Sequence, residues 1–110
     1  MNYNEIPTPD FKKFFKKLYK KYPSLKNDLV KLVEKLEEDY NIGVALGSNL
    51  YKIRLAIESK NKGKSGGARI IYLFLVQNNE IYLIHIFDKS QFENISKETL
   101  LKLLKNSDLL

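Results

Sequence analysis

The first third of the chain carries two helical patterns of apolar residues. Thr8 can cap a helix that starts at Pro9, and apolar residues then recur at helical spacing while lysines fill the other side. Pro23 ends this helix, and Ser24 is expected to cap a second one that runs to about Asp39. The apolar positions are Phe11, Phe14, Phe15, Leu18, Tyr19 and Tyr22, and then Leu25, Leu29, Leu32, Val33 and Leu36. The short connection between the helices predicts an antiparallel helical hairpin.

From Leu50 the apolar period changes to two, which predicts strands. Tyr51, Ile53, Leu55 and Ile57 alternate with Lys52, Arg54, Ala56 and Glu58, so one face of the first strand is apolar and the other basic. Residues 68–76 and 81–87 are apolar on both parities, as in strands covered on both faces, and Asn78-Asn79 between them predicts a tight hairpin. Ser96 then caps a last helix that carries Leu100, Leu101, Leu103 and Leu104.

This order of elements predicts an α+β fold, in which a helical hairpin precedes an antiparallel three-stranded meander and a C-terminal helix follows it. Residues 2–6 can add a fourth strand at a sheet edge. With 110 residues and 44% apolar residues, residues 1–110 are expected to form a single domain around one core.

Composition narrows the chemistry. The chain has no cysteine and one histidine, His85, so we expect no metal site, no disulfide and no cofactor. It shows neither a signal-peptide pattern nor an apolar run near the ~18 residues of a membrane span. We therefore expect a soluble cytoplasmic protein without a membrane partner.

Positive charge is concentrated in two segments. The formal net charge is +6, and residues 10–21 hold six lysines against Asp10, for 6 − 1 = +5. Residues 52–69 hold four lysines and two arginines against Glu58, again 6 − 1 = +5, so the rest carries 6 − 10 = −4. This distribution predicts a directed polyanion-binding surface, with a solvated lysine face as the simple alternative for the first segment.

The second basic segment contains Gly63-Lys64-Ser65, which resembles a nucleotide-binding P-loop. A P-loop needs a glycine five positions before Gly63, where Glu58 stands, and a helix directly afterwards, where a strand pattern begins. We therefore predict a β-hairpin connection in which Lys60, Lys62 and Lys64 contact the phosphates of a polyanion.

Three stretches together resemble a known family: FKKFFKKLYKKYPSLKNDL, YKIRLAIESKNKGKSGGARIIY, and IYLIHIFDKS followed by ENISKETL. They resemble the RelE/HigB/ParE superfamily of toxins from bacterial type II toxin–antitoxin systems, and the middle stretch looks like the HigB-type branch. The resemblance covers nearly the whole chain. It implies a RelE-like domain, with the helical hairpin packed on a small twisted antiparallel sheet. It also implies an endoribonuclease (mRNA interferase) that cuts mRNA in the ribosome, blocks translation and is inhibited by a cognate antitoxin.

The resemblance also implies roles for individual residues. Lys52 and Arg54 stand where family members contact the mRNA backbone, Arg69 where an arginine stabilises the scissile phosphate, and Lys89 near a further basic residue. The family's C-terminal tyrosine has no counterpart here. Two alternatives therefore stay open: a ParE-like gyrase inhibitor without nuclease activity, and a non-catalytic homologue that binds RNA or antitoxin.

Metal-independent RNA cleavage needs a base for the 2′-hydroxyl, positive charge for the phosphorane and an acid for the leaving 5′-oxygen. The candidate bases are His85 and Tyr72, with Asp88 less favoured. A lone histidine in an apolar strand is more often a core residue, and Tyr72 is more often structural than part of an RNA-binding surface. A lysine crowded by other cations is a further candidate for proton transfer.

Overall fold

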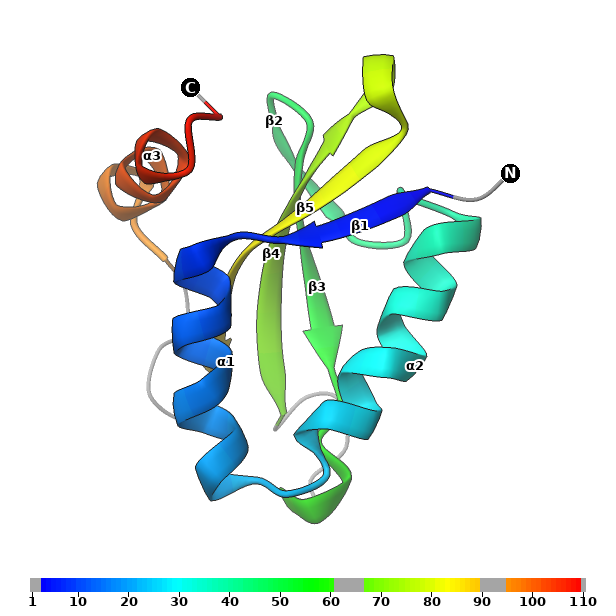
Figure 1. Cartoon of the computed structure of the whole chain (residues 1–110), viewed down its shortest axis with the longest axis vertical. Helices are drawn as coiled ribbons and strands as arrows, with labels where there is room; N and C mark the ends of the chain where they lie inside the picture. Colours follow the sequence, from blue (N-terminus) through cyan, green and yellow to red (C-terminus); the bar gives the residue numbers. More distant parts are fainter. Residues whose placement is uncertain (1–2, 61–66, 90–94, 110) are drawn as a thin grey trace.

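A five-stranded sheet forms the centre of the computed structural model, which describes residues 3–60, 67–89 and 95–109 (Figure 1). The strand order is β1-β5-β4-β3-β2. In chain order the elements are β1 (Asn4–Pro7), α1 (Pro9–Lys21), α2 (Leu25–Glu38), β2 (Val44–Gly47), β3 (Leu50–Leu55), the 3₁₀ turn η1 (Glu58–Lys60), β4 (Ala68–Leu75), the 3₁₀ turn η3 (Val76–Asn78), β5 (Glu80–Asp88) and α3 (Lys97–Asn106). The predicted α+β class is confirmed. None of the described helices combines the length and apolarity that a membrane span requires.

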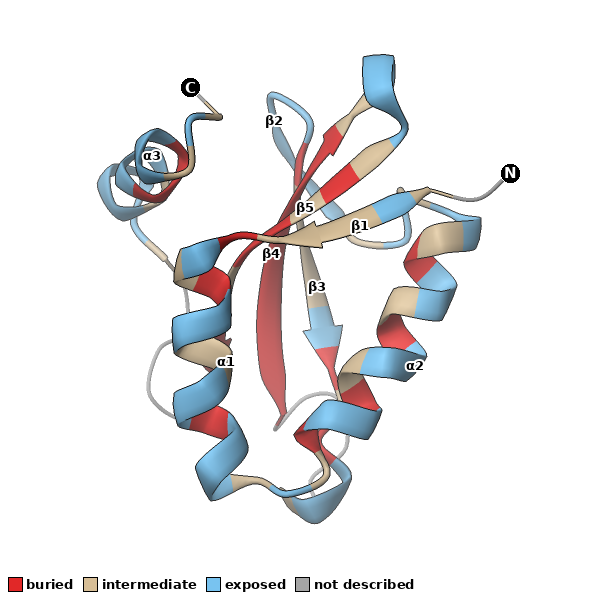
Figure 2. Ribbon diagram, in the orientation of Figure 1, coloured by how far each residue is buried: buried red, intermediate tan, exposed pale blue. Residues whose placement is uncertain are grey.

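Apolar side chains cover both faces of the sheet, which explains why β4 and β5 show no alternation. One core joins α1 and α2 to side chains such as Ile70 and Tyr72 of β4, and the other joins α3 to the opposite face, where Ile71 meets Leu103 and Leu104. β4 is accordingly buried along almost its whole length (Figure 2). Basic residues of β3 therefore remain accessible only where neither layer of helices covers the sheet.

The helix boundaries agree closely with the sequence pattern. Thr8 caps α1, since its hydroxyl accepts a hydrogen bond of 3.2 Å from the backbone N–H of Phe11. Ser96 caps α3 in the same way, with 3.1 Å to the N–H of Thr99. α1 and α2 run in opposite directions as predicted, but they diverge from their short connection and cover different parts of the same face of the sheet (Figure 1).

The prediction that Ser24 caps α2 is wrong. Its side chain makes no capping bond. Instead, the Ser24 hydroxyl donates to Asp28 at 2.8 Å and accepts from the backbone N–H of Ser59 at 2.8 Å. The serine is used to fasten η1 to the start of α2.

The sheet edges differ most from the prediction. β1 is the predicted N-terminal strand, but it pairs parallel to β5, so the sheet is mixed. β2 was not predicted, because all four of its residues are exposed. Its apolar residues Val44 and Leu46 are exposed too, so they do not mark a buried strand face. β3 ends at Leu55 and gives way to η1, where Asp28 accepts a hydrogen bond of 3.2 Å from the N–H of Glu58.

Candidate functional site

A groove of about 1100 Å³ lies between α2 and the part of the sheet that contains β2 and β3. β2 is paired with β3 only as far as Lys52, so within the described residues the outer edge of residues 53–55 carries no neighbouring strand. The lining residues of interest are charged: the bases Lys31, Lys35, Lys52, Arg54, Arg69 and Lys89, and the acids Asp28 and Glu58. This excess of cations makes the groove a candidate site for a polyanion.

Arg54 and Arg69 form the most unusual feature of this groove. They stand directly opposite each other on the antiparallel strands β3 and β4, so their side chains leave the same face. Arg54 is exposed, whereas Arg69 is only 5% exposed, with Nη1 donating to the carbonyl oxygen of Ala68 at 3.0 Å. Burial, and next the charge of Arg54, lower the pKa of Arg69, although a guanidinium remains protonated in proteins. Like charges directly opposite are destabilising, and a bound anion would relieve that repulsion.

The strand ends beside Arg69 are held close together by backbone contacts. The N–H of Lys89 donates to the carbonyl oxygen of Gly67 at 3.1 Å, which joins the end of β5 to the start of β4. A Cβ atom on Gly67 would lie 2.0 Å from the carbonyl oxygen of Leu55, so only glycine permits this approach. Arg69 and Lys89 consequently line the same groove.

Four predicted site residues are thus brought together: Lys52, Arg54, Arg69 and Lys89. Lys62 and Lys64 lie outside the described residues. The other predicted residues, Tyr72, His85 and Lys60, do not line the groove in the part of the chain that the structure describes.

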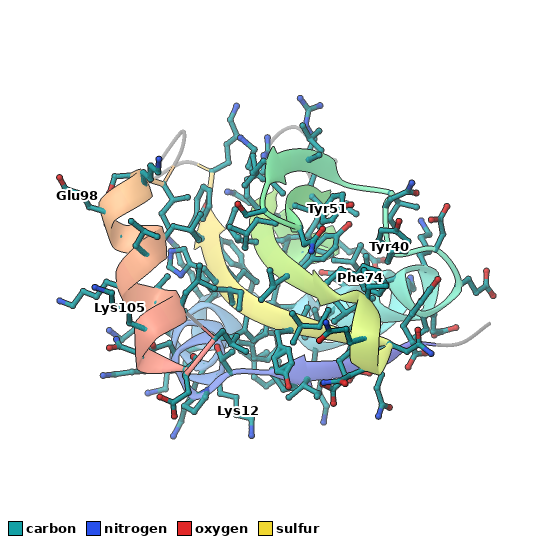
Figure 3. All side chains as sticks on the ribbon, turned by 90° about the horizontal axis from the view of Figure 1, so that it is seen from above. Lys12, Tyr40, Tyr51, Phe74, Glu98 and Lys105 are labelled. Atoms are coloured by element: carbon teal, nitrogen blue, oxygen red, sulfur yellow. The ribbon has the colours of Figure 1, made fainter. Side chains whose placement is uncertain are left out.

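Tyr72 is fully buried on the face that α2 covers. Its hydroxyl donates to the carbonyl oxygen of Tyr40 at 2.6 Å and accepts from the N–H of Gly43 at 3.1 Å, and its ring stacks on Tyr51. Burial is the main cause that raises the pKa of Tyr72 to about 12. The labelled side chains Tyr40, Tyr51 and Phe74 lie together in Figure 3, at the end of the sheet where this aromatic cluster forms. The geometry gives Tyr72 a structural position.

His85 lies against Phe14, with ring centroids 4.4 Å apart, and beside Phe87 at 5.6 Å. Its Nδ1 is buried and has no hydrogen-bond partner in the described part of the chain. Burial lowers the pKa of His85, and the nearby carboxylate of Asp10 opposes this shift. His85 packs among aromatic side chains and does not line the groove. This position favours a structural role for His85 over the role of a catalytic base.

Lys60 is engaged in an ion pair with Asp88. The Lys60 Nζ atom lies 2.5 Å from a carboxylate oxygen of Asp88, and the two side chains are 9% and 0% exposed. The hydroxyl of Tyr22 donates to the other Asp88 oxygen at 2.8 Å, and the Lys60 ammonium lies 5.4 Å from the centre of the Tyr22 ring. This cluster anchors η1 to β5 and to the end of α1. The Asp88 carboxylate, a less favoured candidate base from the sequence, is therefore engaged in an ion pair and a hydrogen bond.

Four charged groove residues were not found from the sequence: Asp28, Lys31, Lys35 and Glu58. Lys31 and Lys35 are four residues apart, which places them on the same side of α2. That spacing was visible, but only the angle between α2 and β3 brings this side to the groove. Glu58 was read as the end of a strand, whereas η1 presents it as an exposed carboxylate.

Comparison with known proteins identifies the fold and the family of the chain. The sequence profile described as "RelE toxin of RelE / RelB toxin-antitoxin system" matches residues 11–109. Among solved structures, the chain is similar to an arginine-to-alanine mutant of E. coli toxin RelE in the free state, with a TM-score of 0.67 and 18% identity over 96% of this chain and 98% of that one. It is also similar to the isolated E. coli RelE toxin, with a TM-score of 0.61 and 19% identity over 94% and 97% of the two chains. The structural matches support the fold, and the profile match over nearly the whole chain shows that the protein belongs to the RelE family of toxin–antitoxin toxins.

Proposed function

We propose that this toxin is a ribosome-dependent mRNA endonuclease that blocks translation and is neutralised by a cognate antitoxin. The observation that carries the proposal is the opposition of Arg54 to the buried Arg69 inside a cationic groove. Repulsion between the two guanidinium groups destabilises the free protein, and a phosphate bound between them would relieve that repulsion. Membership of the RelE family supplies the class of substrate.

The proposed reaction is attack of the ribose 2′-oxygen on the adjacent phosphorus. The bond from phosphorus to the 5′-oxygen breaks, which leaves a 2′,3′-cyclic phosphate on one fragment and a 5′-hydroxyl on the other. We assign Arg69 to the charge that develops on the phosphorane, where a positioned cation is most effective. Lys52, Arg54 and Lys89 would bind the flanking phosphates.

Two proton transfers accompany this step. The exposed carboxylate of Glu58 lines the groove and can accept the proton of the 2′-hydroxyl, while the Lys52 ammonium can donate one to the leaving 5′-oxygen. Asp28 is less suited, since it is buried and accepts hydrogen bonds from Ser24 and from the N–H of Glu58. The ribosome would align the substrate and so reduce the demand on any single group.

A second candidate is a homologue that binds RNA without cutting it. It is favoured by the positions of the buried Tyr72 and the half-buried His85, neither of which lines the groove. Glu58→Gln separates the two candidates, because it removes the proposed base and one negative charge but leaves the cations. Under the nuclease proposal this variant binds RNA at least as tightly as the wild type and has lost cleavage.

Induced expression, with and without the neighbouring gene, tests the proposal. We expect growth arrest that the neighbouring gene relieves, together with mRNA ends that accumulate inside translated codons. Arg69→Ala and the Lys52→Ala/Arg54→Ala pair should abolish the arrest while circular dichroism stays native. Full toxicity in both variants would rule out the groove, and intact mRNA with blocked DNA supercoiling would indicate the ParE-like alternative.

A further inference from the structure

The groove has a second basic wall that neither the family resemblance nor the strand pattern assigns. Lys31 and Lys35 extend from α2 and line the same groove as Lys52 and Arg54 of β3. The side chains of Lys52 and Arg54 leave the face of the sheet opposite to α2, so the groove passes around the outer edge of β3. Both lysines are exposed, and the described residues give neither of them a carboxylate within ion-pair distance. Glu34 and Glu38 share a smaller hollow with them on the same helix. The two lysines are therefore solvated cations that face the groove.

The spacing of the two walls suits one extended strand of nucleic acid. Residues four apart on a helix have Cβ atoms roughly 5–6 Å apart. Residues two apart on a strand, such as Lys52 and Arg54, are separated by about 6.6 Å along it. Both repeats are comparable to the distance between successive phosphates of an extended single strand, so each wall can neutralise neighbouring phosphates.

We propose that Lys31 and Lys35 form a phosphate-binding wall on α2 that holds the single-stranded RNA on either side of the cleavage point. This inference rests on the RNA-binding groove of the proposed function and extends it to a helix. The lysines hold the strand equally before and during the reaction, since they act on phosphates that do not react. They therefore affect substrate affinity and not the chemical step.

The test is the salt dependence of binding to a short, fluorescently labelled single-stranded RNA. Each phosphate contact on a single strand contributes a slope of about −0.7 in log K against log salt, so Lys31→Ala/Lys35→Ala should reduce the slope by about 1.4. The same relation predicts that affinity falls about 25-fold at 0.1 M salt. Alanine is the best helix former, so the variant is expected to fold.

The matched control is Lys13→Ala/Lys17→Ala on α1. These lysines are also four apart and exposed, and their loss removes the same charge, but they do not line the groove. The control should keep the wild-type slope, and Lys31→Arg/Lys35→Arg should restore it. In a cleavage assay on ribosome-bound mRNA, the alanine pair on α2 should raise KM and leave kcat unchanged.

Two outcomes of the salt titration would overturn the inference. If both alanine pairs reduce the slope alike, the effect is the diffuse field of the protein; if neither does, α2 makes no phosphate contact. Loss of antitoxin binding without loss of RNA binding would also refute it, in favour of a protein-binding surface. If the wild type cleaves mRNA and the Lys31→Ala/Lys35→Ala variant binds RNA normally, this inference alone is refuted. If the wild type binds no RNA, the proposed function is refuted as well.

Discussion

Arg54→Gln should stabilise the free protein while it weakens RNA binding. Arg54 lies directly opposite the buried Arg69, and opposed residues on antiparallel strands have Cβ atoms about 4.5–5.5 Å apart. For guanidinium groups roughly 7 Å apart, Coulomb's law gives a repulsion of about 0.6 kcal/mol at the dielectric constant of water and about 2.4 kcal/mol at an effective value of ~20. Because Arg54 is exposed, the lower end applies, and we expect a gain of about 0.5 kcal/mol at low ionic strength.

Thermal unfolding is a suitable assay for this gain. In a domain of this size, about 0.5 kcal/mol corresponds to a rise in Tm of roughly 2 °C. The rise should shrink in high salt, because the Debye length falls to about 3 Å at 1 M. Lys13→Gln on α1 is the control, since it removes the same charge from an exposed site away from Arg69. The reasoning is refuted if Arg54→Gln gains no more than this control, or if its gain is undiminished in high salt.

Three further predictions concern groups that the structure places outside the groove. Asp88→Ala should lower the free energy of unfolding by about 3–5 kcal/mol in urea titrations, because it leaves the Lys60 ammonium buried without its carboxylate; a loss below about 1 kcal/mol would contradict the buried ion pair. His85 has a lowered pKa in the folded state, so its contribution to stability is full above about pH 6.5 and is lost as the pH falls; His85→Phe should therefore show a smaller drop in Tm between about pH 7 and about pH 5, and an equal drop would contradict the buried site. Tyr72 has its pKa raised from 10.0 to about 12, so its contribution to stability is full below pH 10.0 and is lost towards pH 12. Tyr72→Phe should be less stable at neutral pH by about 1–3 kcal/mol and should lose less stability than the wild type between pH 10.0 and about 12. An equal alkaline loss in both proteins would contradict the buried hydroxyl.

The basic strand shows why part of the site could be predicted from the sequence. Lys52 and Arg54 alternate with apolar residues, so their common face follows from strand geometry alone. Their pairing with Arg69 depends on the hairpin register, which the strand pattern left open and the structure gives. The basic residues of α2 could not be assigned to the groove from the sequence, because the position of Lys31 relative to β3 depends on how two distant elements pack.

The strands covered on both faces show the opposite case. Residues of β4 and β5 are apolar on both parities, so alternation could not decide where Tyr72 and His85 point. The register between β4 and β5 also shifts between Ile71 and Tyr72, which changes the relation of the two strands within the pair. A strand that is buried on both faces lacks the alternation of apolar and polar residues that identified the two faces of β3.

The sheet edges were least predictable. β1 leads directly into α1, and nothing in its four residues specifies parallel pairing with β5. β2 is exposed throughout, so no burial pattern marks it. Its turn into β3 is nevertheless encoded locally, since Gly47, Ser48 and Asn49 all adopt positive φ values.

Cleavage of ribosome-bound mRNA by the purified protein tests the central claim most directly. Messenger RNA would be incubated with the wild type or with Arg69→Ala, with and without ribosomes, and the fragment ends would be mapped. We predict that only the wild type with ribosomes produces fragments with 5′-hydroxyl and 2′,3′-cyclic phosphate ends inside the codon at the A site. Intact mRNA after treatment with a folded wild-type protein that arrests growth in cells would contradict the proposed function.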